Sequence, residues 1–187
     1  MTRIVAGSAG GRRLRVPPAG TRPTSDRVRE ALFSALDARI DFDGARVLDL
    51  YAGSGALGLE ALSRGAARAL LVESDRKAAA IVRGNIADLG LPGAELRVGA
   101  VAAVLQQGGA EPFDLVMSDP PYEVDTDAVI ADLRALAARD WLATGAVVVV
   151  ERSVRSPEIV WPTGYIPSKV RKYGETRIEL AEYDPAI

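Results

Sequence analysis

A short segment after an apolar run carries the groups best suited to chemistry in this sequence. The run from Phe113 to Met117 is typical of a buried strand, and it leads into Asp119-Pro120-Pro121-Tyr122. Proline fixes its own φ and restricts the residue before it, so the strand must end and the loop must be stiff. Such a loop can hold a carboxylate, backbone carbonyls and a ring in fixed relation, as chemistry on a planar amine requires. The simpler interpretation is a strand-ending turn without a chemical role.

A glycine-rich segment supplies a second set of candidate residues. Gly53, Gly55 and Gly58 match the pattern G-x-G-x-x-G around Ser54, and Glu73 follows Gly53 by 20 residues. The first two glycines permit a tight turn that a ligand can approach closely, and the third permits close packing of a helix on a strand. An acid at this offset typically holds ribose hydroxyls. The pattern therefore predicts an adenosine-containing cofactor, in preference to a purely structural glycine turn.

Asp49, which lies just before this turn, distinguishes between two possible cofactors, a dinucleotide and S-adenosylmethionine. A carboxylate there would repel the pyrophosphate of a dinucleotide, but it would attract the cationic amino acid end of S-adenosylmethionine. The Asp-Pro-Pro-Tyr segment also has no use in hydride transfer. We therefore predict S-adenosylmethionine as the cofactor.

Both segments depend on an alternation of predicted strands and helices. Apolar strands are predicted over residues 45–50, 69–73, 95–98, 113–117 and 147–151. Helices are predicted over residues 75–89, 101–106 and 126–138. A further helix has its cap among residues 24–26 and an apolar stripe from Val28 to Leu36, and another begins after the glycine turn, before Glu60. Such an alternation forms a parallel sheet covered on both faces, whose ligands bind at the carboxyl ends of the strands. Asp49, Glu73 and Asp119 lie at or beside strand ends, so we expect three acids at one edge of the sheet.

The beginning of the chain is strongly basic, although the net charge of the whole chain is only −2. Residues 1–30 hold seven arginines against two acidic residues, a balance of +5, whereas residues 31–187 have a balance of −7. An Arg-rich start on an acidic body indicates contact with a polyanion, and the alternative is a solvated arm without a partner.

Four of the seven arginines belong to a predicted hairpin over residues 3–16 with a glycine-rich turn, which is followed by a linker over residues 17–20. A two-stranded hairpin is marginal in water, so it must pack on the body or on a partner, or stay mobile. The candidate polyanion-binding residues are Arg3, Arg12, Arg13, Arg15 and Arg22. A predicted hairpin over residues 166–183 offers a second, weaker basic patch, which is equally consistent with a solvated hairpin: Lys169, Arg171, Lys172 and Arg177.

Absent residue types narrow the chemistry further. The chain contains no His and no Cys. Zinc sites of the usual kind, Ser-His-Asp and Cys-His catalysis, and cysteine adducts on pyrimidines are therefore excluded. We expect no metal, no membrane span and no signal peptide, and we predict a cytoplasmic location, which a chain without disulfides permits.

Combined, these motifs resemble a known group of enzymes. The segment from Asp49 to Gly55, Glu73 and the segment from Asp119 to Tyr122 are similar to motifs of Rossmann-like S-adenosylmethionine-dependent methyltransferases that modify exocyclic or amide nitrogens. The more specific likeness lies at the beginning of the chain. There, the hairpin and the block from Arg22 to Phe33 resemble the RsmD family, and the likeness extends to Gly174.

The resemblance implies an α/β fold of class I methyltransferase type. This fold has a mostly parallel, seven-stranded sheet with helices on both faces and a small N-terminal β-hairpin extension. Residues 1–20 would form an RNA-binding hairpin and linker, and residues 21–187 the methyltransferase domain. The implied reaction moves a methyl group to the N2 amine of one guanine, guanine 966 of bacterial 16S ribosomal RNA. The enzyme would act as a monomer on an assembling small ribosomal subunit.

The resemblance also assigns roles to individual residues. Asp119 and the Pro120 carbonyl would accept the two N2 hydrogens, which localises the lone pair of the amine, while Tyr122 would stack on a flipped base and Pro121 would stiffen the loop. The hairpin arginines, Arg22, Lys169 and Arg171 would contact RNA phosphates. Many methyltransferases carry an acid after the third strand, whereas Gly99-Ala100-Val101 stands here, so backbone groups would meet the adenine. The implied cofactor-binding residues are Asp49, Tyr51, Gly53, Ser54, Gly55, Glu73, Ala100 and Asp119.

Three other functions fit parts of the pattern. An adenine-N6 nucleic-acid methyltransferase would use the same Asp-Pro-Pro-Tyr segment, although nothing in the chain resembles a target-recognition domain for duplex DNA. A non-catalytic RNA-binding assembly factor would retain the fold without the reaction. A dinucleotide oxidoreductase fits the glycine pattern alone.

Overall fold

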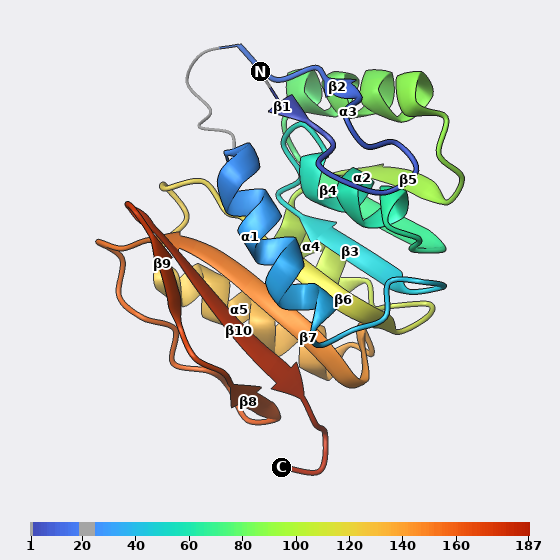
Figure 1. Ribbon diagram of the computed structural model, residues 1–187. Coiled ribbons are helices and arrows are strands. Elements are labelled where there is room, and N and C mark those ends of the chain that lie inside the picture. The colour runs from blue at the N-terminus through green and yellow to red at the C-terminus, as the bar shows by residue number, and fades with distance from the viewer. Residues whose placement is uncertain (1, 19–24) are drawn as a thin grey trace.

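The computed structural model describes residues 2–18 and 25–187, which form a central sheet with helices on both faces (Figure 1). Five parallel strands follow one another across the sheet: β5 (Ala94–Val98), β4 (Arg68–Glu73), β3 (Arg46–Leu50), β6 (Phe113–Ser118) and β7 (Leu142–Ser153). The antiparallel strand β10 (Thr176–Tyr183) comes next, and its outer edge pairs with β8 (Tyr165–Pro167) and β9 (Arg171–Tyr173). Seven strands were predicted, but the sheet has eight: seven lie in one row, and β9 pairs with β10 outside that row.

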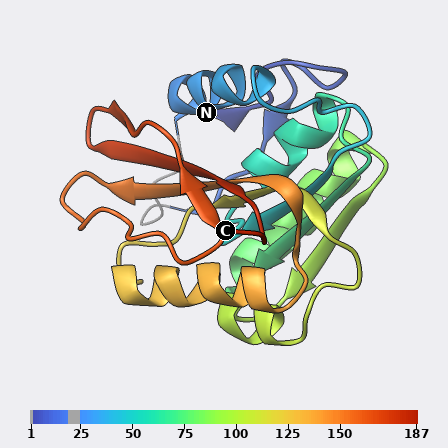
Figure 2. The ribbon, with the colours of Figure 1, turned by 90° about the horizontal axis from the view of Figure 1, so that it is seen from below.

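The helices cover the two faces of the sheet unequally (Figure 2). One face carries the following three helices: α1 (Asp26–Asp37), α2 (Ala56–Ser63) and α3 (Arg76–Leu89). The other face carries α4 (Val101–Gln106) and α5 (Thr126–Ala138). In β7, Val147 and Val149 join the first core, while Val148 and Val150 join the second. This double burial explains why β7 is continuously apolar.

Side-chain caps fix where three helices begin. Ser25 accepts the N–H of Val28 at the start of α1, and Asp125 accepts the N–H of Ala128 at the start of α5. Asp75 caps α3, which ends at Gly90 in a left-handed conformation (φ 64°). These are the cap and stop residues that helix ends favour. They place the N-termini of α3 and α5 beside the carboxyl ends of β4 and β6.

The N-terminal hairpin (residues 2–18) is packed on the body. Its paired part is shorter than predicted, since only β1 (Thr2–Arg3) and β2 (Arg13–Leu14) pair. Ile4 and Leu14 are buried in the same core as α1 and α2. The apolar side of the hairpin therefore covers the body, and its arginines face outward.

The C-terminal part departs from the predicted hairpin. Pro167 opposes Ala181, and Arg171 opposes Ile178. Between these two pairs the outer segment advances four residues, whereas β10 advances only three. The extra residue is a bulge that divides the predicted strand over residues 166–172 into β8 and β9, because an unmatched residue interrupts the ladder. Among the described residues, no helix is long and apolar enough to span a membrane.

Candidate active site

Three acids gather at the carboxyl edge of the parallel strands, as predicted from the sequence. Asp49 is the penultimate residue of β3, Glu73 ends β4, and Asp119 directly follows β6. The three strands are neighbours, with β3 between the other two. Adjacent strands lie about 4.8 Å apart. Asp49 therefore lies between two further carboxylates.

Asp49 is the most perturbed of these acids. Its side chain is 1% exposed. Oδ2 accepts the backbone N–H of Gly58 at 2.9 Å, whereas Oδ1 is buried without a hydrogen-bond partner. Burial raises the pKa of Asp49 well above its ordinary value, and the charges of Asp119 and Glu73 raise it further against the opposing effect of the Gly58 N–H. A buried, unpartnered carboxylate oxygen beside two other acids is a site that favours a cation.

The glycine turn (residues 51–55) is held against β4 by Glu73. The N–H of Gly53 donates to Glu73 Oε1 at 2.8 Å, and the N–H of Asp75 donates to Oε2 at 2.8 Å. Gly55 has a φ of 84°, and a Cβ there would lie 3.0 Å from Leu71 Cδ2. A left-handed residue this close to the core must be glycine. The turn therefore presents backbone groups beside a carboxylate whose position is fixed.

Tyr51 joins the glycine turn to α5. It has a φ of 58°, and its hydroxyl donates to Asp132 Oδ2 at 2.5 Å. Burial, followed by the contact with Asp132, raises the pKa of Tyr51, and burial also raises the pKa of Asp132. The hydroxyl of Tyr51 is thus already hydrogen-bonded within the protein.

The loop after β6 presents its groups at the same edge. Asp119 is half-buried and its N–H donates to the carbonyl of Leu50, while Pro120 is buried. The carbonyl of Pro121 accepts the N–H of Val124 at 3.0 Å, which turns the chain towards α5. Tyr122 is 64% exposed. Tyr122 is therefore not a packed core ring, and its face is accessible.

Ala100 lies at the same edge, beyond Glu73. It is the exposed N-cap of α4, and its carbonyl accepts the N–H of Val104. The N–H of Gly99 donates to the carbonyl of Glu73 at 3.0 Å. The chain after β5 is thus placed beside Glu73 and offers backbone groups only.

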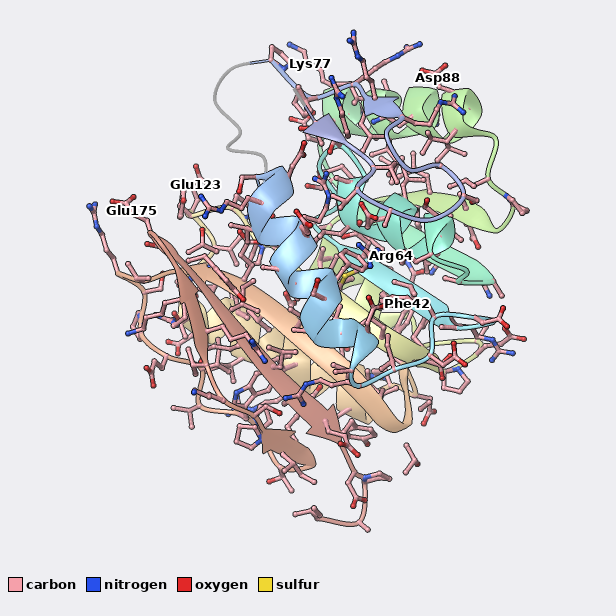
Figure 3. The ribbon with its side chains drawn as sticks, viewed as in Figure 1. Phe42, Arg64, Lys77, Asp88, Glu123 and Glu175 are labelled. Atoms are coloured by element: carbon pink, nitrogen blue, oxygen red, sulfur yellow. The ribbon has the colours of Figure 1, made fainter. Side chains whose placement is uncertain are left out.

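The basic residues predicted for RNA divide into two groups in space. The N-terminal hairpin lies over α3, beside Asp88 (Figure 3). Arg15 pairs with Asp88 at 3.0 Å, and Arg12 donates to the carbonyl of Asp88. Arg3 and Arg13 are exposed on the same hairpin. Arg22 lies outside the described residues.

The second group lies on the C-terminal strands. Lys169, Arg171 and Lys172 are exposed. Arg177 is 2% exposed and pairs with Glu179 at 3.1 Å, so its predicted place in a basic surface patch is wrong. Arg29, counted in the basic balance of the N-terminus, is also fully buried.

Sequence reasoning missed the residues that hold the hairpin to the body. Glu60 of α2 is fully buried, and it accepts the N–H groups of Val5 at 2.8 Å and Ala6 at 3.1 Å. It also pairs with Arg29 at 3.5 Å and Arg64 at 3.1 Å. Within the sequence, the only available signal was an acid among the apolar residues of a predicted buried helix.

Comparison with known proteins identifies the family. The family described as Conserved hypothetical protein 95 matches residues 2–182. The chain belongs to this family, the RsmD family. The chain is 42% identical to an RsmD-family relative, the ribosomal RNA small subunit methyltransferase D of Escherichia coli, over 95% of this chain and 88% of that protein. It is 35% identical to a putative rRNA methyltransferase of Bacillus subtilis, over 95% and 97% of the two chains.

Two solved structures show the same fold. A putative methyltransferase from Escherichia coli superposes with a TM-score of 0.87 at 34% identity, over 98% of both chains. A putative methylase from Haemophilus influenzae gives a TM-score of 0.79 at 31% identity, over 97% of this chain and 98% of that chain. The predicted class I methyltransferase fold with a small N-terminal hairpin is therefore confirmed.

Proposed function

We propose that this protein transfers a methyl group from S-adenosylmethionine to the N2 amine of a guanine in 16S ribosomal RNA, guanine 966 by family resemblance. The observation that carries the proposal is the position of two features on neighbouring strands. The cation-favouring oxygen of Asp49 lies on β3, and the loop from Asp119 to Tyr122 follows β6. The name of the Escherichia coli relative supports ribosomal RNA as the substrate class.

The residues around Asp49 fit S-adenosylmethionine. This cofactor supplies an electrophilic methyl group on a sulfonium ion. The unpartnered Oδ1 of Asp49 would receive its ammonium group, which restores a hydrogen bond and a counter-charge at a buried site. Glu73 keeps unused lone pairs on both oxygens and would accept from the ribose hydroxyls. The backbone around Gly53, Ser54 and Gly55 and that of Ala100 would complete the site.

The loop from Asp119 to Tyr122 would act as the clamp for the target amine. An aryl amine is a weak nucleophile because its lone pair is delocalised into the ring. Asp119 and the Pro120 carbonyl would accept its two hydrogens and localise that lone pair, and holding the reactants in line lowers the barrier. The exposed ring of Tyr122 would stack on the base, worth about 1–3 kcal/mol. This stacking would offset the few kcal/mol that unstacking the base costs.

The N-terminal hairpin is assigned to RNA binding. Its exposed arginines, with Arg22, would contact phosphates and position the substrate without reading its sequence. Lys169 and Arg171, which are also exposed, would form a second contact. We infer that residues 1–20 serve as the RNA-binding extension of a methyltransferase domain over residues 21–187. We also infer that the protein acts as a monomer in the cytoplasm on an assembling small subunit.

The test offers labelled S-adenosylmethionine with naked 16S ribosomal RNA, assembled small subunits, or DNA. Digestion to nucleosides followed by mass spectrometry distinguishes N2-methylguanine from N6-methyladenine. We expect N2-methylguanine from a ribosomal substrate, and its position is mapped on small subunits from a strain that lacks the gene. Transfer to DNA alone, or N6-methyladenine as the product, would overturn the proposal.

A pair of variants tests the clamp. Asp119→Ala should bind S-adenosylhomocysteine and lose transfer, because it removes one acceptor for the amine. Asp127→Asn, which changes an exposed acid in the first turn of α5, should keep both activities. If the wild-type protein binds ribosomal RNA but methylates no nucleic acid, a non-catalytic assembly factor becomes the better description.

A further inference from the structure

Asn85 is a buried polar residue that the proposed chemistry leaves unused. It lies on α3, and its side chain is 1% exposed. Its Oδ1 accepts the backbone N–H of Arg15 at 2.8 Å. Its Nδ2 donates to the carbonyl of Arg15 at 2.9 Å and to the carbonyl of Ser54 at 2.8 Å. One side-chain amide therefore connects the N-terminal hairpin to the glycine turn.

The three hydrogen bonds fix the orientation of this amide. An Asn side chain has two N–H donors and one acceptor oxygen. Both donors meet carbonyls here, and the oxygen meets the single N–H. A rotation by 180° would place the NH₂ group of Asn85 against the N–H of Arg15 and its oxygen against two carbonyls. Because the site is buried, moving either segment would leave polar groups unpaired, which is unfavourable.

Each segment is also held on its far side. The guanidinium of Arg15 pairs with Asp88, and a Cβ on Gly84 would lie 3.0 Å from Arg15 Nη1, so this side chain lies flat on α3. Ser54 stands between Gly53, which donates to Glu73, and Gly55, which precedes α2. Asn85 is thus the direct link between the exposed basic surface and the edge where the three acids meet.

We propose that Asn85 is a positioning residue that couples the two segments, so that RNA on the hairpin and cofactor at the glycine turn bind cooperatively. This inference rests on the proposed function, because it takes the hairpin as the RNA surface and the turn as the cofactor site. Ordering a segment costs conformational entropy. When two segments share one amide, the ligand that orders the first lowers the cost of ordering the second. Thermodynamic linkage makes the effect reciprocal.

The test measures the dissociation constant of S-adenosylhomocysteine by calorimetry, with and without a saturating amount of whichever ribosomal substrate the protein binds, naked 16S ribosomal RNA or small subunits. For the wild-type protein, RNA should tighten binding by about five-fold or more, the lower end of typical coupling between sites. Asn85→Asp has the same size and keeps one acceptor, but it loses both donors. In this variant the two dissociation constants should agree. No coupling in the wild-type protein, or equal coupling in both proteins, would overturn the inference.

Ser63→Ala is the matched control. Ser63 Oγ accepts the N–H of Ala9 at 2.9 Å and donates to the carbonyl of Ala6 at 2.6 Å, so this variant also loses two contacts with the hairpin. Ser63 is the last residue of α2, about 12 Å along the helix from the glycine turn. The variant should therefore keep the coupling. If it loses coupling as fully as Asn85→Asp does, general loosening of the hairpin explains the effect and the role of Asn85 is refuted.

Hydrogen exchange gives a readout that requires no catalysis. S-adenosylhomocysteine should slow exchange at the amide of Arg15 in the wild-type protein and in Ser63→Ala, but not in Asn85→Asp. The outcomes also separate the two proposals. If the wild-type protein binds neither S-adenosylhomocysteine nor RNA, the proposed function fails. If it binds both independently, only the coupling fails.

Discussion

The substitution Asp49→Asn removes the buried charge at the centre of the proposed cofactor site while it keeps the shape of the side chain. The oxygen of the new amide can still accept the N–H of Gly58, so the contact between β3 and α2 survives. The second oxygen, which has no partner in the protein, becomes an NH₂ group. The NH₂ group and the ammonium group of the cofactor are both hydrogen-bond donors, so they would repel each other.

The size of the effect follows from the lost interaction. A hydrogen bond to a charged group contributes about 1.5–3 kcal/mol. A charge pair 4 Å apart is worth at most about 4 kcal/mol at the effective dielectric constant of a protein surface. Since about 1.4 kcal/mol corresponds to a factor of ten, we expect cofactor affinity to fall by roughly 10- to 100-fold.

The pH dependence gives an independent signature. Because the pKa of Asp49 in the folded protein is raised above its ordinary value of 3.8, the folded state binds this proton more tightly than the unfolded state. The stability of the ligand-free protein should fall as pH rises from about that value through the raised pKa. Cofactor affinity should rise over the same interval, because the cation requires the ionised carboxylate.

Calorimetry with S-adenosylhomocysteine between about pH 5 and pH 8.5, together with urea unfolding, checks both effects. In Asp49→Asn, affinity should be low and independent of pH, and the ligand-free protein should be more stable than the wild type near neutral pH. Asp114→Asn is the matched control, because Asp114 also accepts a backbone N–H, from Arg46, but at the amino end of β6. Wild-type affinity in Asp49→Asn would refute the assignment of the cation site.

Three further predictions concern the clamp, the RNA surface and the docking of the hairpin. Tyr122→Ala should lower methyl transfer by about 5- to 150-fold, equivalent to the 1–3 kcal/mol of stacking, while Tyr122→Phe keeps most of the rate; an equal loss in both would point to the hydroxyl instead. Arg13→Gln should weaken RNA binding for every sequence tested and reduce the salt slope of log Kd by about one, whereas an unchanged slope would remove Arg13 from the phosphate contacts. Glu60→Ala should destabilise the protein by about 3–5 kcal/mol in urea unfolding, because it removes a buried carboxylate from Arg29 and leaves the N–H groups of Val5 and Ala6 without their acceptor. A loss below about 1 kcal/mol would show that Asp26, which also pairs with Arg29, is a sufficient partner.

The sequence alone was sufficient to predict the edge of the sheet where the acids meet. Strand ends, glycine turns and proline stops are local features, and parallel topology then brings the ends of separate strands to one edge. Asp49, Glu73 and Asp119 could therefore be placed together without coordinates. Gly55 could also be recognised as a turn residue, because a positive φ strongly favours glycine.

The tertiary structure decided which charged and polar groups face solvent. From the sequence, Arg29 and Arg177 would be expected at the surface. In the structure both are buried, where Arg29 pairs with Glu60 and Arg177 pairs with Glu179. Burial of a charge depends on whether folding brings a partner to it, and the pattern around the residue does not show this.

The same reason explains why the internal links of the site were not predicted. Tyr51 and Asp132 are 81 residues apart, and Asn85 stands 70 residues from Arg15 and 31 from Ser54. These hydrogen bonds form only because folding brings distant segments together, through the pairing of β3 with β6 and the packing of α3 against the hairpin. Residue types and spacing thus located the chemistry, whereas packing between distant segments determined what holds it in place.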